Sequence, residues 1–351
     1  MRGMPASIIH QMVNNLPARF ADVEALEAFL SQPTPELERE LAAIDAILVL
    51  GVGGKMGPTL ARMARRAGKR VVGVARFSEP GLRARLEAWG IECLACDLLD
   101  RAALERLPRL AHVVFMAGHK FGAAGNAALT WAMNVGVPYA VADLFEGSTI
   151  VAFSTACVYP YMPVDGPGAD ESVPATPPPG DYATTCVGRE HAFLFGSQRH
   201  GTPGRLMRLE YAIDMRYGVL HDIARRVFAG EPVDVTMGHV NLLWQGEANE
   251  QALRLLAHAT TPTTPINVSG AEVLSVRWLA EEFGRLFGKA VSIAGREAPT
   301  AWLVDTSAAR RLFGAPRVPL ARMLEWQADW VSRGLPSLGR PTHFETRDGQ
   351  Y

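Results

Sequence analysis

A short apolar segment that leads directly into a glycine-rich turn constrains this chain more than any other feature. Residues 46–51 (AILVLG) predict a buried strand, and the turn GVGGKMG places Gly51, Gly54 and Gly57 three residues apart. Glycine at a strand end permits a tight turn. The missing side chains let backbone N–H groups approach a phosphate at the positive end of the following helix. Strand, turn and helix in this order predict a dinucleotide-binding site, with an empty glycine turn as the alternative.

The segments that follow alternate between apolar strands and helices. Further strands are expected at 70–75, 91–97, 111–118 and 148–154. Each of them is apolar throughout instead of at every second residue, which is typical of a parallel sheet covered by helices on both faces. The sequence therefore predicts an α/β fold, with a Rossmann-type doubly wound parallel sheet and a smaller C-terminal substrate-binding lobe.

Changes in pattern along the chain divide it into three expected parts. Residues 1–45 predict an N-terminal helical extension, and residues 46–204 the nucleotide-binding domain. Residues 205–351 predict mainly the substrate-binding lobe, with late elements that return to the sheet. A proline- and glycine-rich surface loop is expected at 160–180.

Composition excludes several classes of protein. The chain has 351 residues, 48% of them hydrophobic, and a net charge of −1, so a nucleic acid is not an expected partner. Its apolar runs are too short to span a bilayer, and its N-terminus lacks a secretory pattern, so we expect a soluble cytoplasmic protein. Cys93 and Cys96 form a lone C-x-x-C in an apolar segment, where packing is favoured over zinc, and no metal is expected.

The end of the second expected strand bears on the choice of cofactor. It reads Ala75-Arg76, at a position where an acidic residue usually binds the ribose 2′-hydroxyl of NAD. An arginine there pairs with a 2′-phosphate, which favours NADP over NAD. The alternative is that Arg76 is only a solvated residue at the strand end.

Further motifs follow the glycine turn in a recognisable order. They are Asp97-Leu98, Met116-Ala117-Gly118 with Lys120, Asn134, FSTACVYP with Thr155, PPPGDY with Tyr182, and INVSG at 266–270. In this order they resemble the extended short-chain dehydrogenase/reductases, the NAD(P)-dependent sugar epimerase/dehydratase family, over roughly residues 46–335.

The resemblance implies two sets of binding residues. Those expected at the cofactor are Gly51, Gly54, Lys55, Met56, Gly57, Arg76, Asp97, Leu98, Met116, Ala117, Gly118, Lys120 and Tyr182. Those expected at the substrate are Ser154, Tyr211 and His221, beside the hydroxyl of Thr155.

The family's catalytic motif Y-x-x-x-K is incomplete in this chain. In DYATTCVGREH, Tyr182 matches the tyrosine and Glu190 an acidic position, but Cys186 stands where the family has lysine. A helix is expected over 182–199, with Asp181 as its N-cap. In the family, tyrosine moves a proton while nicotinamide takes or gives hydride, and the ammonium lowers a tyrosine pKa that is ordinarily about 10. A neutral cysteine cannot do this, and packing is favoured over a catalytic thiolate.

Two cations are candidates for the role of the missing lysine. The chain has only four lysines and none between Lys120 and Lys289. Arg189 lies three residues beyond Cys186 and so near the same helix face, while Lys120 follows the fourth strand. We expect Tyr182, Thr155 and Arg189 to form the catalytic set, with Lys120 as the second candidate cation.

Three functions are compatible with this pattern. The leading one is an NAD(P)-dependent epimerase or dehydrogenase that acts on a hydroxyl or carbonyl of a sugar, sugar acid or nucleotide sugar. The alternatives are a non-catalytic NADP(H) sensor, and a lyase or isomerase on the same scaffold. The resemblance also implies a homodimer formed through helices near 125–146 and 182–199, and both are apolar on more than one face.

Overall fold

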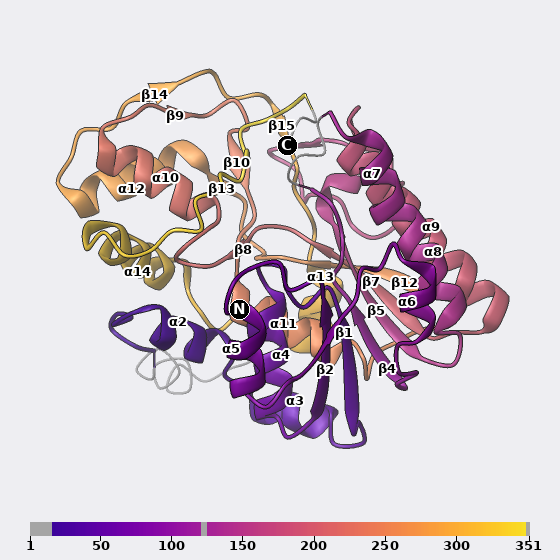
Figure 1. The fold of residues 1–351 in the computed structure, drawn as a ribbon. Coiled ribbons are helices and arrows are strands. Elements are labelled where there is room, and N and C mark those ends of the chain that lie inside the picture. The colour runs from indigo at the N-terminus through magenta and orange to yellow at the C-terminus, as the bar shows by residue number, and fades with distance from the viewer. Residues whose placement is uncertain (1–15, 121–124, 349–351) are drawn as a thin grey trace.

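The computed structural model describes residues 16–120 and 125–348, and its centre is a seven-stranded parallel sheet (Figure 1). The strands stand in the order β12-β7-β5-β4-β1-β2-β3. They are β1 (Ala46–Leu50), β2 (Arg70–Ala75), β3 (Glu92–Ala95), β4 (His112–Phe115), β5 (Thr149–Thr155), β7 (Gly204–Leu209) and β12 (Thr264–Val268). The strand order reverses at β1, where β4 lies on its other side, and in such sheets ligands bind at the carboxyl ends beside this point. The predicted fold class is confirmed.

Helices cover both faces of the sheet. One face carries α4 (Gly57–Arg66), α5 (Leu82–Ala88), α11 (Gln245–Arg254) and α13 (Ser307–Phe313), and the other carries α6 (Arg101–Glu105), α8 (Val137–Leu144) and α9 (Asp181–His200). In β1, Val49 faces the first core and Leu48 the second, and both are fully buried. Burial on both faces explains why the strands are apolar at every position.

The helix expected over 125–146 is interrupted. It consists of α7 (Ala127–Trp131), a π-helical turn η1 (Ala132–Gly136), and α8. A π turn is a local widening that is frequent at functional sites. Its central residue, Asn134, is fully buried.

The helix expected over 182–199 is α9, which begins one residue earlier and ends one residue later. Asp181 is its first helical residue and Gly180 is the N-cap, so the prediction of Asp181 as N-cap is wrong. The Asp181 carboxylate still lies in the first turn, where it interacts favourably with the helix dipole. Gly201 ends the helix in a left-handed conformation with φ 70°.

A second lobe stands beside the carboxyl edge of the sheet. Its helices are α10 (Val219–Ala229), α12 (Val276–Phe287) and α14 (Leu320–Ser332). Its short strands, together with the β6–β15 pair that joins it to the first domain, are β6 (Met162–Pro163), β8 (Ala212–Ile213), β9 (Val233–Asp234), β10 (His239–Val240), β11 (Leu243–Trp244), β13 (Leu274–Ser275), β14 (Ile293–Ala294) and β15 (Thr300–Ala301). These elements enclose a core of their own, which includes Ile223, Phe283 and Trp326.

The N-terminal helices join the two cores. Helix α2 (Val23–Leu30) buries Leu26 and Leu30 in the core of the second lobe, whereas α3 (Pro35–Glu40) buries Leu37 in the core beneath the sheet. Residues 1–15 of the expected extension lie outside the described residues.

The C-terminal segment, residues 333–348, returns across the second lobe towards β15 (Figure 1). The Thr342 hydroxyl and N–H both donate to Asp222 on α10, at 2.5 and 2.8 Å. The Tyr161 hydroxyl donates to the Arg347 carbonyl at 2.9 Å. In the parts of the chain that the structure describes, no helix is both long and apolar enough to span a membrane.

Candidate active site

The glycine turn presses against the end of β4. Gly51 has φ +92°, and a Cβ there would lie 2.6 Å from the Ala117 nitrogen. A Cβ on Gly57 would lie 2.3 Å from the Val52 carbonyl oxygen. Helix α4 begins at Gly57 with no side-chain cap, which leaves its first N–H groups to another partner. An uncapped helix start beside such a turn fits the pyrophosphate of a dinucleotide.

The other residues expected at the cofactor lie along the same edge of the sheet. Arg76 is exposed directly after β2. Asp97 is exposed after β3 and accepts the Leu99 N–H at 3.0 Å, whereas Leu98 is buried in the core. Met116 and Ala117 follow β4, with Gly118 exposed beyond them, and Met116 packs with Met56 against the core under the turn.

Tyr182 and Thr155 come from neighbouring elements. Tyr182 is half-buried in the first turn of α9, and Thr155 ends β5 with its hydroxyl accepting the Cys157 N–H at 3.2 Å. Cys186, one turn beyond Tyr182, is fully buried in an apolar cluster with Val158. Burial raises the pKa of the Cys186 thiol to about 11, so it is protonated at neutral pH. This side chain packs and brings no charge to the site.

Burial also governs the tyrosine. It raises the pKa of Tyr182 well above the usual value of 10, and the neighbouring Cys186 and Cys157 act in the same direction. Arg189 acts in the opposite direction but does not outweigh the burial. At neutral pH Tyr182 is therefore a neutral phenol, which can donate a proton or a hydrogen bond.

Arg189 is held beneath the site by two hydrogen bonds. One guanidinium nitrogen donates to the Phe153 carbonyl at 2.9 Å and the other to the Asn134 side-chain oxygen at 2.8 Å. The second nitrogen would also lie 2.4 Å from a Cβ on Gly118, so the arginine fills the space that this glycine leaves. Because Arg189 is only 6% exposed, its main visible role is to brace the strand ends.

Lys120 approaches the tyrosine from the end of β4. Its Nζ lies 5.5 Å from the centroid of the Tyr182 ring. Burial lowers the pKa of Lys120. The second candidate cation thus contacts the tyrosine itself, whereas the first is bound to backbone and amide oxygens below it.

Ser154 does not face a substrate. Its hydroxyl donates to Glu190 at 2.6 Å, and Arg208 binds both oxygens of that carboxylate, at 2.9 and 2.6 Å. Arg208 also donates to the Tyr159 hydroxyl at 2.6 Å. The structure commits Ser154 to this buried network instead of the substrate role that we expected, because successive residues of a strand point to opposite faces.

His221 is also turned away from the cleft. It is 3% exposed on α10, and its two ring nitrogens lie 2.9 Å from the Ser337 hydroxyl and 3.1 Å from the Gln327 amide. Burial lowers the pKa of His221 to about 4, so it is neutral at pH 7. Both ring nitrogens are occupied by the C-terminal part of the chain, which argues against the expected substrate contact.

Tyr211 keeps a position that suits a functional residue. It follows β7 with φ 37°, a left-handed conformation that is unusual for tyrosine. Such strained residues concentrate at functional sites. The side chain is half-buried, and burial raises its pKa well above 10.

Residues 47–211 match the model of the NAD dependent epimerase/dehydratase family. The chain belongs to this family. In it, this chain departs from the Y-x-x-x-K pattern at Cys186 alone, with the tyrosine and the strand-end hydroxyl of Thr155 in place.

Three solved structures show the fold that family members share with this chain. UDP-glucose 4-epimerase of Thermus thermophilus in complex with NAD is 19% identical, with a TM-score of 0.69, and the match covers 81% of this chain and 98% of that one. For the Bordetella bronchiseptica enzyme WbmG in complex with NAD the values are 20%, 0.71, 85% and 97%. For UDP-glucuronic acid 4-epimerase of Bacillus cereus in complex with NAD they are 18%, 0.68, 82% and 99%. No curated protein sequence matches significantly.

Two features of this family member escaped the sequence analysis. Glu210, directly after β7, is buried with neither carboxylate oxygen hydrogen-bonded to another described residue, and burial raises its pKa well above 4.5. Its place at the carboxyl end of a strand is a signal that could have marked it. Lys55, expected only at the cofactor, reaches the second lobe and donates to the Ala212 carbonyl at 2.8 Å. No local pattern could have shown that contact.

Proposed function

We propose that this chain is an NAD(P)-dependent enzyme that oxidises, reduces or epimerises a hydroxyl or carbonyl group of a sugar, sugar acid or nucleotide sugar. One observation carries the proposal: Lys120 stands against the ring of Tyr182 although lysine is absent at position 186. An amine from another element then supplies the charge that the family motif lacks. Family membership supports the reaction class.

The cofactor proposal rests on the glycine turn and on Arg76. The turn and the uncapped start of α4 suit a pyrophosphate, and exposed Arg76 suits a 2′-phosphate, so NADP is the proposed cofactor. A bound nicotinamide supplies hydride exchange. The two epimerases named above and WbmG were solved with NAD, which keeps NAD as the alternative.

In this proposal Tyr182 transfers the proton and Thr155 orients the reacting oxygen. A neutral phenol acts as an acid when a carbonyl is reduced, but it must lose its proton before it can act as a base. A charged Lys120 favours that loss, and a lysine can itself relay a proton, which arginine cannot. We therefore place Lys120 ahead of Arg189 as the supporting cation. Oxidation should proceed faster at alkaline pH.

The test is a screen of sugars, sugar acids and nucleotide sugars, followed by cofactor absorbance and product analysis. Tyr182→Phe and Lys120→Met should each lower turnover, the first by about 10²- to 10⁴-fold, as is typical for a lost acid–base group. Lys69→Met, at the remote end of α4, is the control and should leave turnover unchanged. If Tyr182→Phe retains the full rate, the tyrosine has no acid–base role and the proposal fails.

A non-catalytic NADP(H) sensor is the second candidate, and the uncharged, buried Cys186 favours it. Tight cofactor binding without turnover of any compound in the screen would support this alternative. Product formation without any net change in cofactor absorbance, in a Tyr182-dependent manner, would indicate epimerisation. Lyase chemistry on the same scaffold would give a cleaved product that forms without cofactor.

A homodimer is also proposed. Trp131, Tyr139 and Phe195 are 44%, 49% and 49% exposed on α7, α8 and α9. Tyr139 and Phe195 stack with ring centroids 6.1 Å apart, so they form an exposed apolar surface on adjacent helices. Light scattering should show a dimer for the wild type and a monomer for the double variant Tyr139→Glu, Phe195→Glu. A wild-type monomer at micromolar concentration would contradict the proposal.

A further inference from the structure

Lys55 is the one side chain of the glycine turn that leaves the first domain. Val52 and Met56, the other non-glycine residues between Gly51 and Gly57, pack against the core beneath the sheet. The Lys55 Nζ instead donates to the Ala212 carbonyl and lies 4.3 Å from the centroid of the Tyr217 ring.

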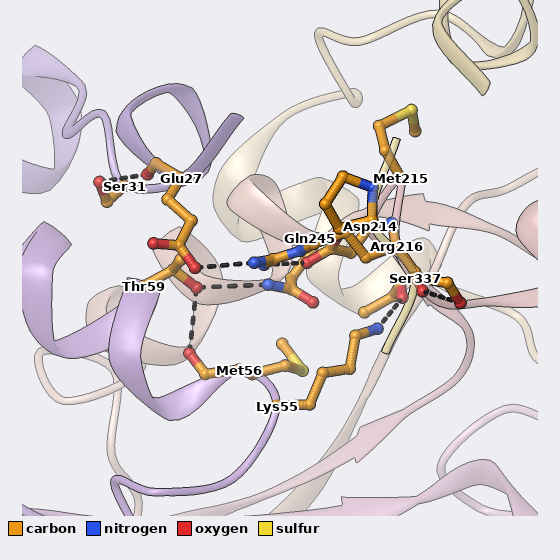
Figure 2. A network of polar contacts seen from close by, with 12 residues as sticks. Glu27, Ser31, Lys55, Met56, Thr59, Asp214, Met215, Arg216, Gln245 and Ser337 are labelled. Atoms are coloured by element: carbon orange, nitrogen blue, oxygen red, sulfur yellow. Dashed lines mark hydrogen bonds and ion pairs between the residues drawn. The ribbon is translucent and has the colours of Figure 1, made fainter. Parts of the chain in front are cut away.

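Figure 2 shows the Lys55 side chain extending towards the segment of the second lobe that carries Asp214 and Arg216. The backbone of Lys55 belongs to the turn that suits a phosphate, whereas its amine touches the second lobe. The amine therefore lies at the joint between the two ligand-facing parts of the molecule.

The nearby acid is already paired. Asp214 is fully buried, and its two oxygens accept the Arg216 guanidinium at 3.1 and 2.8 Å. Arg216 also donates to Glu27 of helix α2 at 2.8 Å, so its charge is balanced by two carboxylates. Within residues 16–120 and 125–348, no carboxylate forms an ion pair with Lys55.

The surroundings of Lys55 leave it short of negative charge. Burial lowers the pKa of Lys55 to about 7, and Arg216 and Lys120 act in the same direction. Asp214 and Asp222 oppose the shift without restoring the usual value of 10.5. A buried ammonium with only a carbonyl and a ring as partners is unfavourable by itself, and an entering anion would compensate for it. Groups perturbed in this way are frequent at functional sites.

We propose that Lys55 is an anion-binding residue that pairs with a phosphate or carboxylate group held between the glycine turn and the second lobe. An ammonium has three donors, so it can bind an anion and still keep the bond to Ala212. Two sources have this chemistry: the pyrophosphate of the cofactor, on the side of the turn, and an acidic group of the substrate, on the side of Tyr217. The inference rests on the proposed function only in that one of these molecules supplies the anion.

The low number of lysines makes a direct test practical. With lysine labelled by ¹³C at Cε, NMR gives one signal for each of Lys55, Lys69, Lys120 and Lys289. Lys55→Arg and Lys120→Arg each remove one signal and so assign the two buried lysines. The Lys55 signal is then titrated with pH alone, with NADP⁺, with NADP⁺ plus glucuronate, and with NADP⁺ plus inorganic phosphate. NADP⁺ plus glucose is the neutral control.

We expect the Lys55 midpoint near pH 7 in the free protein and at least one pH unit higher when the anion is bound. A shift with NADP⁺ alone identifies the pyrophosphate as the partner. A shift that requires glucuronate or phosphate identifies an acidic substrate. Because turnover is not measured, this result is independent of the test of Tyr182.

The binding arm uses calorimetry on Lys55→Met and Lys55→Arg. Loss of one charge-assisted hydrogen bond should weaken the anionic probe about 10- to 150-fold in Lys55→Met, and Lys55→Arg should retain most of the affinity. Lys69→Met is the matched control and should bind as the wild type does. If no anionic probe moves the Lys55 midpoint, or if glucose moves it equally, Lys55 is only a strut between the lobes and the proposal is overturned.

Discussion

The tyrosine end and the glycine-turn end of the cleft handle positive charge in different ways. At the tyrosine end the lysine of the family motif is replaced by buried Cys186, and the guanidinium of Arg189 is bound to Phe153 and Asn134 below the site. At the glycine-turn end, Lys55 places its amine against a neutral carbonyl. The first end has a cation used mainly for bracing, and the second has one that lacks a carboxylate partner among the described residues.

This difference separates structural cations from functional ones. An arginine whose donors reach buried carbonyl or carboxylate oxygens stabilises the fold, and its removal leaves those oxygens without a partner. A lysine that is desolvated without an acid loses part of its charge and is available to a ligand. By this criterion Arg189 and Arg208 are structural, whereas Lys55 and Lys120 are candidates for function.

The largest expected effect is on the buried pair beneath the tyrosine. Arg208→Met leaves the Glu190 carboxylate buried without its partner and should lower the free energy of unfolding by about 3–5 kcal/mol. Urea denaturation measures this. The matched control is Arg70→Met, which breaks an exposed pair with Glu92 and should cost no more than about 1 kcal/mol. Equal losses in the two variants would contradict the structural role of Arg208.

The next effect separates the two cations at Tyr182. Arg189→Met removes two charge-assisted hydrogen bonds and should destabilise the protein by about 2–4 kcal/mol. Lys120→Met should change the free energy of unfolding by less than about 1 kcal/mol, because burial of its charge is itself unfavourable. Urea denaturation of both variants, beside turnover, gives the comparison. A large loss of stability in Lys120→Met with normal turnover would reverse the assignment.

A third effect concerns cofactor choice at the glycine-turn end. Arg76→Ala should weaken NADP binding by about 10- to 150-fold, since a charge-assisted pair with the 2′-phosphate is lost. NAD binding should stay unchanged, because NAD has no phosphate at that position. Calorimetric titration of both cofactors checks this. Tighter binding of NAD than of NADP by the wild type would make NAD the cofactor.

The smallest effect is a pH dependence of stability that Lys55 produces. Its pKa is about 7 in the folded protein and 10.5 when unperturbed, so between these values the unfolded chain binds more protons and the wild type gains stability as pH rises. Lys55→Met should lack this gain. Relative to the variant, the wild type should become more stable by on the order of 1 kcal/mol between pH 7 and pH 10, since lost contacts offset part of the change. Urea denaturation at both pH values measures it, and parallel curves would show that Lys55 is not desolvated.

The sequence by itself determined the architecture on the cofactor side. Five apolar segments predicted five strands of the sheet, since a strand buried on both faces must be apolar at every position. The glycines at 51 and 57 stand where any side chain would meet backbone atoms, so their spacing carried the turn. These features depend on residues close together in the chain, which is why they could be predicted.

Only the tertiary structure decided which side chains meet at the cleft. Glu190 and Arg208 lie on different elements, and their pairing turned Ser154 inward. Ser337 and Gln327 occupy His221 from the far C-terminal part of the chain. The amine beside Tyr182 comes from the end of β4 and not from the next turn of its own helix. The partner of a polar side chain is set by packing between distant segments, and one-dimensional spacing contains no record of it.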